Sequence, residues 1–163
     1  MNHRPTGDKQ LAMPTPRILV VDDDQPLVML LKENLELEGY QVTPGFDGGM
    51  AIDLAIAQRP DLIILDINMP TTNGFDTLTH LRKIPETQAI PVIFMTGIKS
   101  DTLYPYIDRH QRVAYMKKPL DLENLNSLVR QFLAQYPLPE APTQPPAKKQ
   151  PESEVFPFIE KLR

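Results

Sequence analysis

The chain contains no cysteine and no tryptophan, and no apolar run approaches the roughly 20 residues that a membrane-spanning helix needs. The lack of cysteine excludes disulfide bonds and thiolate metal sites. The first residues have no apolar core and do not look like a signal peptide. Acidic residues outnumber basic ones, 21 to 17, which argues against general binding to nucleic acids or insertion into membranes. A cytoplasmic protein is therefore the default expectation.

Proline is unevenly distributed along the chain, and its distribution predicts the domain organisation. Residues 1–16 are weakly hydrophobic and contain prolines, which predicts a flexible N-terminal arm. Residues 137–163 are Pro-rich and have few apolar residues before Val155, which predicts a linker or disordered tail. Residues 17–136 have the length of one domain. The end of the tail, residues 155–159, is apolar enough to dock, either on this domain or on a partner.

Apolar runs alternate with helical patterns five times over residues 17–136, which predicts a parallel sheet with helices on both faces. The expected strands are residues 17–21, 40–43, 62–65, 91–95 and 113–116. Helices are expected over residues 26–38, 50–58, 74–83 and 99–110, and after Asp121. Pro44 places the second strand at an edge of the sheet. Pro105 predicts a short or kinked fourth helix.

Polar side chains follow four of these strands at the point where each strand ends. Asp22 and Asp23 follow the first strand, Asp66 the third, Thr96 the fourth and Lys118 the fifth. We expect these groups to lie together, because the C-terminal ends of parallel strands meet at one edge of the sheet. Crowded carboxylates repel one another unless a cation joins them. With no histidine or cysteine nearby, the predicted cation is Mg²⁺.

This arrangement indicates phosphoryl chemistry. A carboxylate beside a divalent ion can attack phosphorus and form an aspartyl phosphate. Mg²⁺ and the Lys118 ammonium would neutralise the charge, and the Thr96 hydroxyl would donate a hydrogen bond to a phosphoryl oxygen. The Lys118–Pro119 bond is a candidate cis peptide. Each signal alone has an ordinary structural explanation, such as capping or a turn, but their order on successive strand ends favours the chemical one.

The sequence resembles the receiver domain of two-component response regulators, of the chemotaxis-regulator type. The resemblance covers about residues 17–136 and is carried by residues 18–24, 61–70 with Gly74, 91–97 and 115–119. It implies an α/β, flavodoxin-like, doubly wound fold with a five-stranded parallel sheet of order 2-1-3-4-5.

The same resemblance implies roles for individual residues. Asp66 would accept a phosphoryl group from a sensor histidine kinase or a phosphotransfer protein, assisted by Lys118 and Thr96. The implied Mg²⁺ ligands are Asp22, Asp23, Asp66 and the backbone carbonyl of Asn68. Thr96 and Tyr115 would then switch a surface made of the fourth helix, fifth strand and fifth helix. That surface would control an unidentified protein target or form a homodimer.

Some features depart from the usual pattern of this family. His110 and Gln111 stand where many receivers carry a glycine-containing turn. Ile98 brings an apolar side chain near the path of an attacking water, from which we expect slow autodephosphorylation. No helix-turn-helix pattern follows residue 136, which indicates a stand-alone regulator that acts through protein contacts. A chain truncated before an effector domain fits the same observation.

Two other functions fit parts of the pattern. A receiver-shaped binding module that no longer uses phosphorylation would keep the fold without the chemistry. An aspartate-nucleophile phosphohydrolase of the haloacid-dehalogenase type would use Asp22 and Asp24, with Thr96 and Lys118 in its later motifs. That alternative does not explain residues 66–70. The receiver reading implies no enzymatic activity beyond the protein's own phosphorylation and dephosphorylation.

Overall fold

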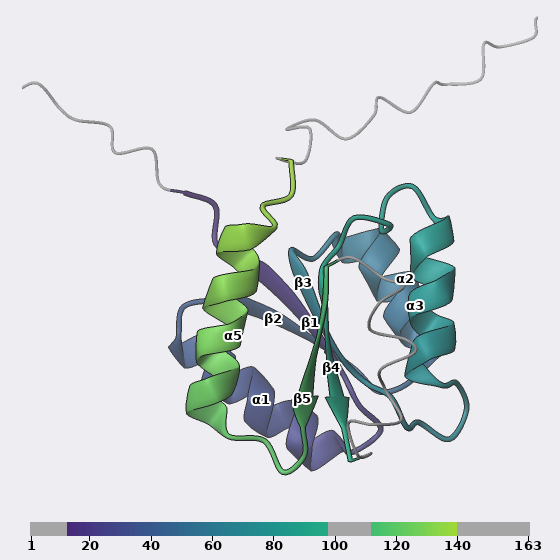
Figure 1. The fold of residues 1–163 in the computed structure, drawn as a ribbon, viewed down its shortest axis with the longest axis horizontal. Coiled ribbons are helices and arrows are strands. Elements are labelled where there is room, and N and C mark those ends of the chain that lie inside the picture. Colours follow the sequence, from purple (N-terminus) through teal and green to yellow (C-terminus); the bar gives the residue numbers. More distant parts are fainter. Residues whose placement is uncertain (1–12, 98–111, 140–163) are drawn as a thin grey trace, which may run out of the picture.

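The computed structural model describes residues 13–97 and 112–139. One parallel sheet runs through the domain in the order β2-β1-β3-β4-β5 (Figure 1). Its strands are β1 (Arg17–Val21), β2 (Gln41–Gly45), β3 (Leu62–Asp66), β4 (Val92–Thr96) and β5 (Val113–Lys117). The predicted flavodoxin-like order is confirmed. The edge position of β2, which contains Pro44, is confirmed as well.

Helices cover both faces of this sheet. They are α1 (Gln25–Leu37), α2 (Gly48–Gln58), α3 (Gly74–Lys83) and α5 (Leu122–Gln135). Figure 1 shows α1 and α5 on one face and α2 and α3 on the other. The helix predicted over 99–110, with Pro105, lies outside the described residues, as do Ile98, His110 and Gln111. None of the helices in the described ranges is long and apolar enough to cross a membrane.

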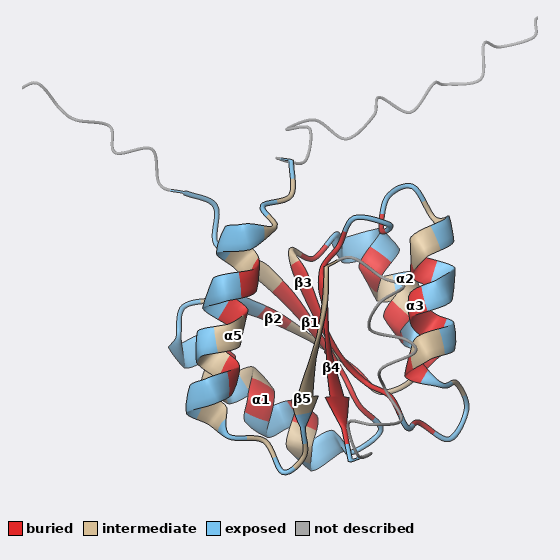
Figure 2. Cartoon of the chain, in the orientation of Figure 1, coloured by how far each residue is buried: buried red, intermediate tan, exposed pale blue. Residues whose placement is uncertain are grey.

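Successive side chains along each strand point to opposite faces of the sheet, and this alternation divides the core into two layers. In β1, Leu19 and Val21 pack with the α2–α3 layer, whereas Ile18 and Val20 pack with the α1–α5 layer. The strands β3 and β4 alternate in the same way, and every residue of both is buried. Figure 2 shows buried strands between helices whose outer sides are exposed. Burial on both faces explains why these strands read as continuous apolar runs in the sequence.

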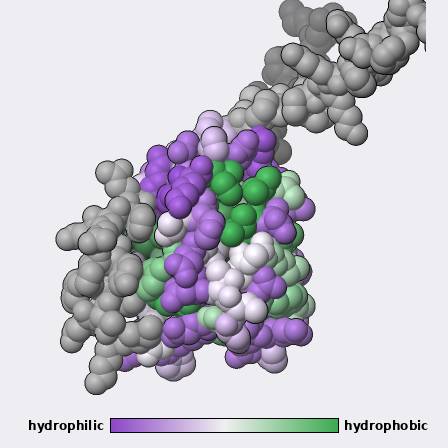
Figure 3. All heavy atoms as spheres, turned by 90° about the vertical axis from the view of Figure 1, so that its right-hand side faces the viewer, coloured by the Kyte–Doolittle hydropathy of each residue, from purple (hydrophilic) through white to green (hydrophobic). Residues whose placement is uncertain are grey.

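The helix α2 is apolar on more than its buried side. Ala51 and Ala55 face the core, while Met50 and Ile56 remain 38% and 41% exposed. Figure 3 shows the α2–α3 side of the molecule, where apolar surface lies among hydrophilic side chains. This composition made the period of α2 harder to read than that of the strongly amphipathic α5, which buries Leu125, Val129 and Phe132.

Polar side chains cap the N-termini of the helices that start at the C-terminal edge of the sheet. Asp24 caps α1 by accepting from the Leu27 N–H, Asp47 caps α2 and Asn73 caps α3. Each cap satisfies a backbone N–H that has no partner within the helix and contributes about 1 kcal/mol. The helix predicted over residues 50–58 begins two residues earlier, at Gly48, because Asp47 is its N-cap.

The segments that precede and follow residues 17–136 contact the domain at the edge of the sheet where the strands begin. The Pro16 carbonyl accepts a hydrogen bond from the Gln41 N–H at 3.0 Å. Leu138 packs against the core layer of α2 and α3. The described ends of the chain, near residues 13 and 139, therefore leave the domain at the same side (Figure 1). The remainder of the predicted arm and tail lies outside the described residues.

Gly74 allows the start of α3 to approach the end of β3. Its N–H donates to the Ile67 carbonyl at 2.8 Å. A Cβ at this position would overlap the Asp66 carbonyl oxygen and lie 2.9 Å from the Ile67 Cα. Both obstacles are backbone atoms, so they cannot turn aside as a flexible side chain would. Only glycine fits between the two elements without moving the end of β3.

We predict that Gly74→Ala lowers the free energy of unfolding by about 1–3 kcal/mol, because the added methyl group overpacks this contact. The measurement is urea unfolding followed by circular dichroism. Gly49→Ala, in the first turn of α2, is the matched control, because its Cβ would meet only the Asp47 carboxylate, at 3.3 Å. Equal unfolding midpoints for the two variants would contradict the close approach at Gly74.

Candidate functional site

Three carboxylates meet at the C-terminal edge of the sheet. Asp66 ends β3 and Asp22 directly follows β1, and these two strands are neighbours in parallel register, with Val21 opposite Leu65. Asp22 is 1% exposed and Asp66 3%, whereas Asp23 is open to solvent. One oxygen from each of the three side chains lies within 4.8 Å of the others. The predicted meeting of these three residues is confirmed.

Backbone contacts hold the Asp22 side chain in place. The Asp22 N–H donates to the Gly45 carbonyl at 3.2 Å, which ties the end of β1 to the end of β2. The Asp22 Oδ1 accepts from the Asp24 N–H at 3.0 Å. The turn between β1 and α1 is thereby closed by the carboxylate itself. Its second oxygen is left to face the centre of the site.

Lys118 reaches the same centre from the end of β5. Its backbone N–H donates to the Thr96 carbonyl at 2.8 Å, and the Lys118–Pro119 bond, a candidate cis peptide in the sequence, is cis. The Lys118 Nζ donates to the Asp22 Oδ2 at 2.6 Å and lies 3.2 Å from the Asp66 Oδ1. One ammonium group therefore bridges the two buried carboxylates.

The charges at this edge are not balanced. Burial raises the pKa of Asp66, the negative charges of Asp22 and Asp23 raise it further, and Lys118 only partly opposes them. Burial works against the Lys118 ammonium, but its contacts with Asp22 and Asp66 outweigh this, so the pKa of Lys118 is raised. Three acids face one lysine, and the site keeps an excess of negative charge.

This donor set fits Mg²⁺. The ligand atoms of the acidic cluster are carboxylate oxygens, and the cluster contains no nitrogen or sulfur donor. Mg²⁺ prefers one or two carboxylates and retains water or phosphate in the rest of its shell. Asn68 lies exposed in the loop that follows β3, two residues after Asp66, and its carbonyl is the oxygen that the sequence resemblance adds to this set.

Thr96 and Tyr115 lie on the strands next to Asp66. Thr96 ends β4 and is 2% exposed, one residue beyond Met95, the register partner of Asp66. Tyr115 of β5 is half-buried and packs against the α2–α3 core layer. Burial raises the pKa of its phenol to about 12. Thr96 therefore lies at the acidic edge of the sheet, and Tyr115 lies on the α2–α3 face next to it.

Phe94 packs against Tyr115, and its part in this arrangement was not predicted from the sequence. Its ring stacks on Tyr115, with centroids 5.4 Å apart and an interplanar angle of 29°. It also lies 5.1 Å from the ring of Phe75 at the start of α3. The available signal was the strand alternation, since Phe94 and Tyr115 are register partners on β4 and β5. The three rings form a row on the α2–α3 face of the sheet.

Comparisons of the sequence and of the structure with known proteins agree on one family. The family described as the response regulator receiver domain matches residues 18–130. Protein PilH of Pseudomonas aeruginosa is 38% identical over 118 residues, which cover 72% of this chain and 98% of PilH. The chemotaxis protein CheY4 of Vibrio cholerae has a similar structure, with a TM-score of 0.69 and 26% identity over 73% of this chain and 99% of CheY4.

Other relatives are longer than the matched region. The transcriptional regulatory protein CpxR of Escherichia coli is 39% identical over 122 residues, which cover 72% of this chain but 49% of CpxR. The chain thus matches nearly the whole of PilH and about half of CpxR. All of these comparisons match the same region of the chain, the domain that contains the acidic site.

We predict that the Tyr115 phenol ionises near pH 12, because its neutral form is favoured by burial. The measurement is the alkaline absorbance titration of the wild type minus that of Tyr115→Phe. An unfolded tyrosine ionises near pH 10, so the contribution of Tyr115 to stability is complete below pH 10 and is lost between pH 10 and 12. A difference titration with its midpoint near 10 would contradict the buried placement.

Proposed function

This chain belongs to the response regulator receiver family, and we propose that it is a single-domain switch controlled by phosphorylation of Asp66. The phosphoryl donor would be the phosphohistidine of a sensor histidine kinase or a phosphotransfer protein. The observation that supports this best is the position of Asp66 beside Asp22, Asp23 and Lys118 at one edge of the sheet.

The proposed step is a transfer between two nucleophiles. A carboxylate oxygen of Asp66 forms a bond to phosphorus while the bond from phosphorus to the imidazole nitrogen of the donor histidine breaks. The imidazole leaves with the electron pair of that bond and takes up a proton. Asp66 must be ionised to attack, and Lys118 favours the ionised form by opposing the effects of burial and of the neighbouring acids.

The residues around Asp66 would stabilise the charge that moves in this step. The Lys118 ammonium, already beside the Asp66 Oδ1, would pair with a phosphoryl oxygen. The Thr96 hydroxyl would donate to another. Mg²⁺, held by Asp22, Asp23, Asp66 and the Asn68 carbonyl, would supply the remaining charge neutralisation when bound. Phosphoryl transfer depends mainly on such positioning and neutralisation, so no further catalytic group is required.

The response to phosphorylation would travel along the sheet toward β5. A phosphoryl group on Asp66 adds charge next to Thr96, and movement of Thr96 would change the space around the neighbouring side chains. Tyr115 would respond, because its ring is held by a stack on Phe94 rather than fixed in the middle of the core. The surface of β5, α5 and the predicted fourth helix would then change its affinity for a protein partner or a second copy.

Action through protein contacts in the cytoplasm is part of the proposal, and the lengths of the relatives bear on it. PilH is matched over 98% of its length, so a receiver domain of this size occurs as a whole protein. The relatives described as transcriptional regulators are about twice the length of the match. Their DNA-directed role is not assigned to this chain, whose domain is acidic overall.

The phosphohydrolase alternative is weakened by Asp24. In that mechanism Asp24 would act as an acid and base in the site. Here its carboxylate accepts from the Leu27 N–H at 3.1 Å and caps α1. The phosphorylation-independent binding module has no specific support, since the acidic residues and Lys118 retain the geometry that the chemistry needs.

We predict that incubation with a small acyl phosphate and Mg²⁺ adds one phosphoryl group to the wild type, seen by intact-protein mass spectrometry. Asp66→Asn should abolish the gain, because the amide is not a nucleophile toward phosphorus. Asp61→Asn, at the opposite end of β3, is the matched control and should be phosphorylated. Phosphorylation of Asp66→Asn, or none of the wild type, would refute the proposal.

We also predict that Mg²⁺ raises the melting temperature of the wild type, since an ion that binds only the folded state stabilises it by about 2.7 kcal/mol at 100 times its Kd. Asp23→Asn should weaken this effect, because Asp23 belongs to the acidic cluster and is exposed, so that its replacement spares the core. Asp53→Asn, exposed on α2, serves as the control. An equal Mg²⁺ response in both variants would argue against the site.

A further inference from the structure

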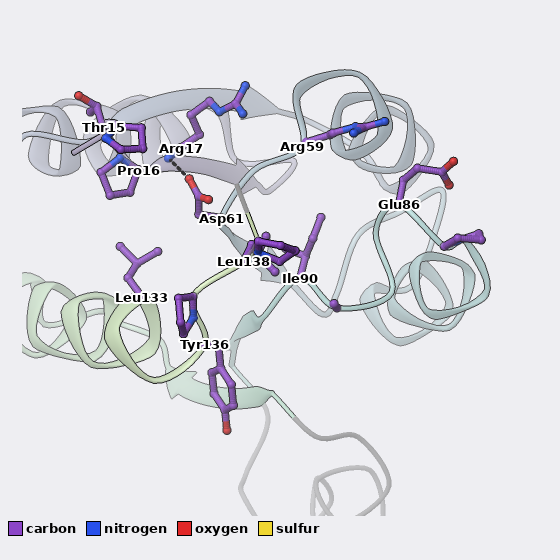
Figure 4. A pocket seen from close by; sticks show the side chains of 15 residues that line it. Thr15, Pro16, Arg17, Arg59, Asp61, Glu86, Ile90, Leu133, Tyr136 and Leu138 are labelled. Carbon is purple, nitrogen blue, oxygen red and sulfur yellow. Dashed lines mark hydrogen bonds between the residues drawn. The ribbon is translucent and has the colours of Figure 1, made fainter. Parts of the chain in front are cut away.

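A groove of about 620 Å³ lies at the edge of the sheet opposite the acidic site. Its walls come from residues that are distant in the sequence, within 14–17, 59–61, 85–90 and 133–139 (Figure 4). These segments surround the N-terminal ends of β1, β3 and β4 and the C-terminal end of α5. Nothing in the proposed phosphoryl chemistry uses this part of the molecule.

The groove has an apolar floor and a charged rim. Ile90 and Leu138 lie together at its centre, with Leu133 and Tyr136 on the α5 side (Figure 4). Several prolines add to the apolar lining. Such a surface binds apolar or Pro-rich segments, because flat aromatic and proline rings pack well against one another.

The rim carries two arginines, Arg17 and Arg59, and the lining also contains acidic residues. The Asp61 Oδ2 accepts from the backbone N–H of Arg17 at 2.7 Å, so this carboxylate is already engaged. Within the described ranges, neither Arg17 nor Arg59 forms a side-chain ion pair. Glu86 is the other acidic residue of the lining. The rim can therefore accept negative charge from an occupant at its two guanidinium groups.

The chain itself carries a segment with matching chemistry. Residues 155–159, Val-Phe-Pro-Phe-Ile, are the apolar part of an otherwise polar, Pro-rich tail. Acidic residues flank this segment, namely Glu152, Glu154 and Glu160. Apolar side chains of this size gain free energy by leaving water, and the flanking carboxylates complement Arg17 and Arg59 on the rim.

The path of the chain brings the segment to the groove. Residues 137–139 form part of the groove wall, and the tail continues from there. Residues 140–154 connect the wall to the apolar segment, and a Pro-rich chain extends about 3.1 Å per residue. This connection is long enough to turn back and short enough to give an effective concentration on the order of 1 mM. The segment is then mostly docked if its intrinsic Kd for the groove is below about 1 mM.

We propose that residues 155–159 bind in this groove of the same chain, with Phe156 and Phe158 on the apolar floor and the flanking glutamates at Arg17 and Arg59. The proposal does not depend on phosphorylation, because the groove and the acidic site lie at opposite edges of the sheet. The docked tail would cover the N-terminal edge of the sheet and the end of α5.

The absence of cysteine allows a direct test in the full chain. Ser153→Cys introduces a single thiol beside the apolar segment, and a nitroxide label on it broadens amide NMR signals that lie nearby. We expect a loss of peak intensity at Arg59, Glu86 and Ala89 that does not change on dilution. Amides at the opposite edge, such as those of Asp23 and Asn68, should keep their intensity when compared with the reduced label.

One double variant and one matched pair of variants separate specific docking from chance contact. In the labelled chain, the double substitution Phe156→Ser and Phe158→Ser should restore the peak intensity of the groove amides. Neither substitution changes a residue of the domain. Ala89→Glu places a charge in the groove from an exposed position and should also restore them. Ala57→Glu, exposed on α2 outside the groove, is its matched control and should leave the broadening intact.

Three results would overturn the proposal. Broadening that grows with protein concentration would show that the tail binds a second copy. Broadening that survives the double Phe variant would show that residues 155–159 are not the bound segment, and that another part of the chain brings the label there. Groove signals of full intensity in the labelled Ser153→Cys chain without further substitutions would show that the tail does not dock.

Discussion

The structure depends on the repulsion among three carboxylates and on the single lysine that partly offsets it. Asp22 and Asp66 are nearly excluded from water, yet each lies within 4.8 Å of the other and of Asp23. Like charges at this distance disfavour ionisation, and burial adds to the effect, so the pKa of Asp66 is raised. Lys118 contacts both buried acids and keeps the arrangement compatible with folding. The negative charge that remains is the feature on which the proposed binding of Mg²⁺ depends.

The rest of the fold supplies the rigidity that such crowding needs. The acids stand on β1 and β3, the central strands, whose side chains are buried on both faces by two core layers. Gly74 lets α3 approach the end of β3, and the Asp22 carboxylate closes its own turn through the Asp24 N–H. A loose scaffold would let the carboxylates separate into water. Close packing prevents that separation and so keeps the three carboxylates together.

The two edges of the sheet have opposite characters. Charged groups at the ends of parallel strands gather at the C-terminal edge, where open α/β sheets commonly place their ligand sites. At the N-terminal edge the chain enters and leaves, and apolar residues of the two flanking segments meet around Ile90 and Leu138. The rings of Phe75, Phe94 and Tyr115 form a row on the α2–α3 face of the sheet. This row joins the start of α3 to β4 and β5.

The sequence by itself determined the element order, the edge position of β2, and the meeting of Asp22, Asp23, Asp66 and Lys118 at one edge. These features follow from local signals, because apolar runs, prolines and strand-terminal polar residues act over a few neighbouring positions. The start of α2 was predicted two residues too late, since Gly48 and Gly49 are not typical helix residues and the Asp47 cap becomes evident only in the structure. Only the tertiary structure decided that Lys118 bridges two acids, that Tyr115 stacks on Phe94, and that residues 14–17 and 133–139 line a common groove. Those contacts join residues far apart in the chain, and they depend on strand register and side-chain packing, which no local pattern encodes.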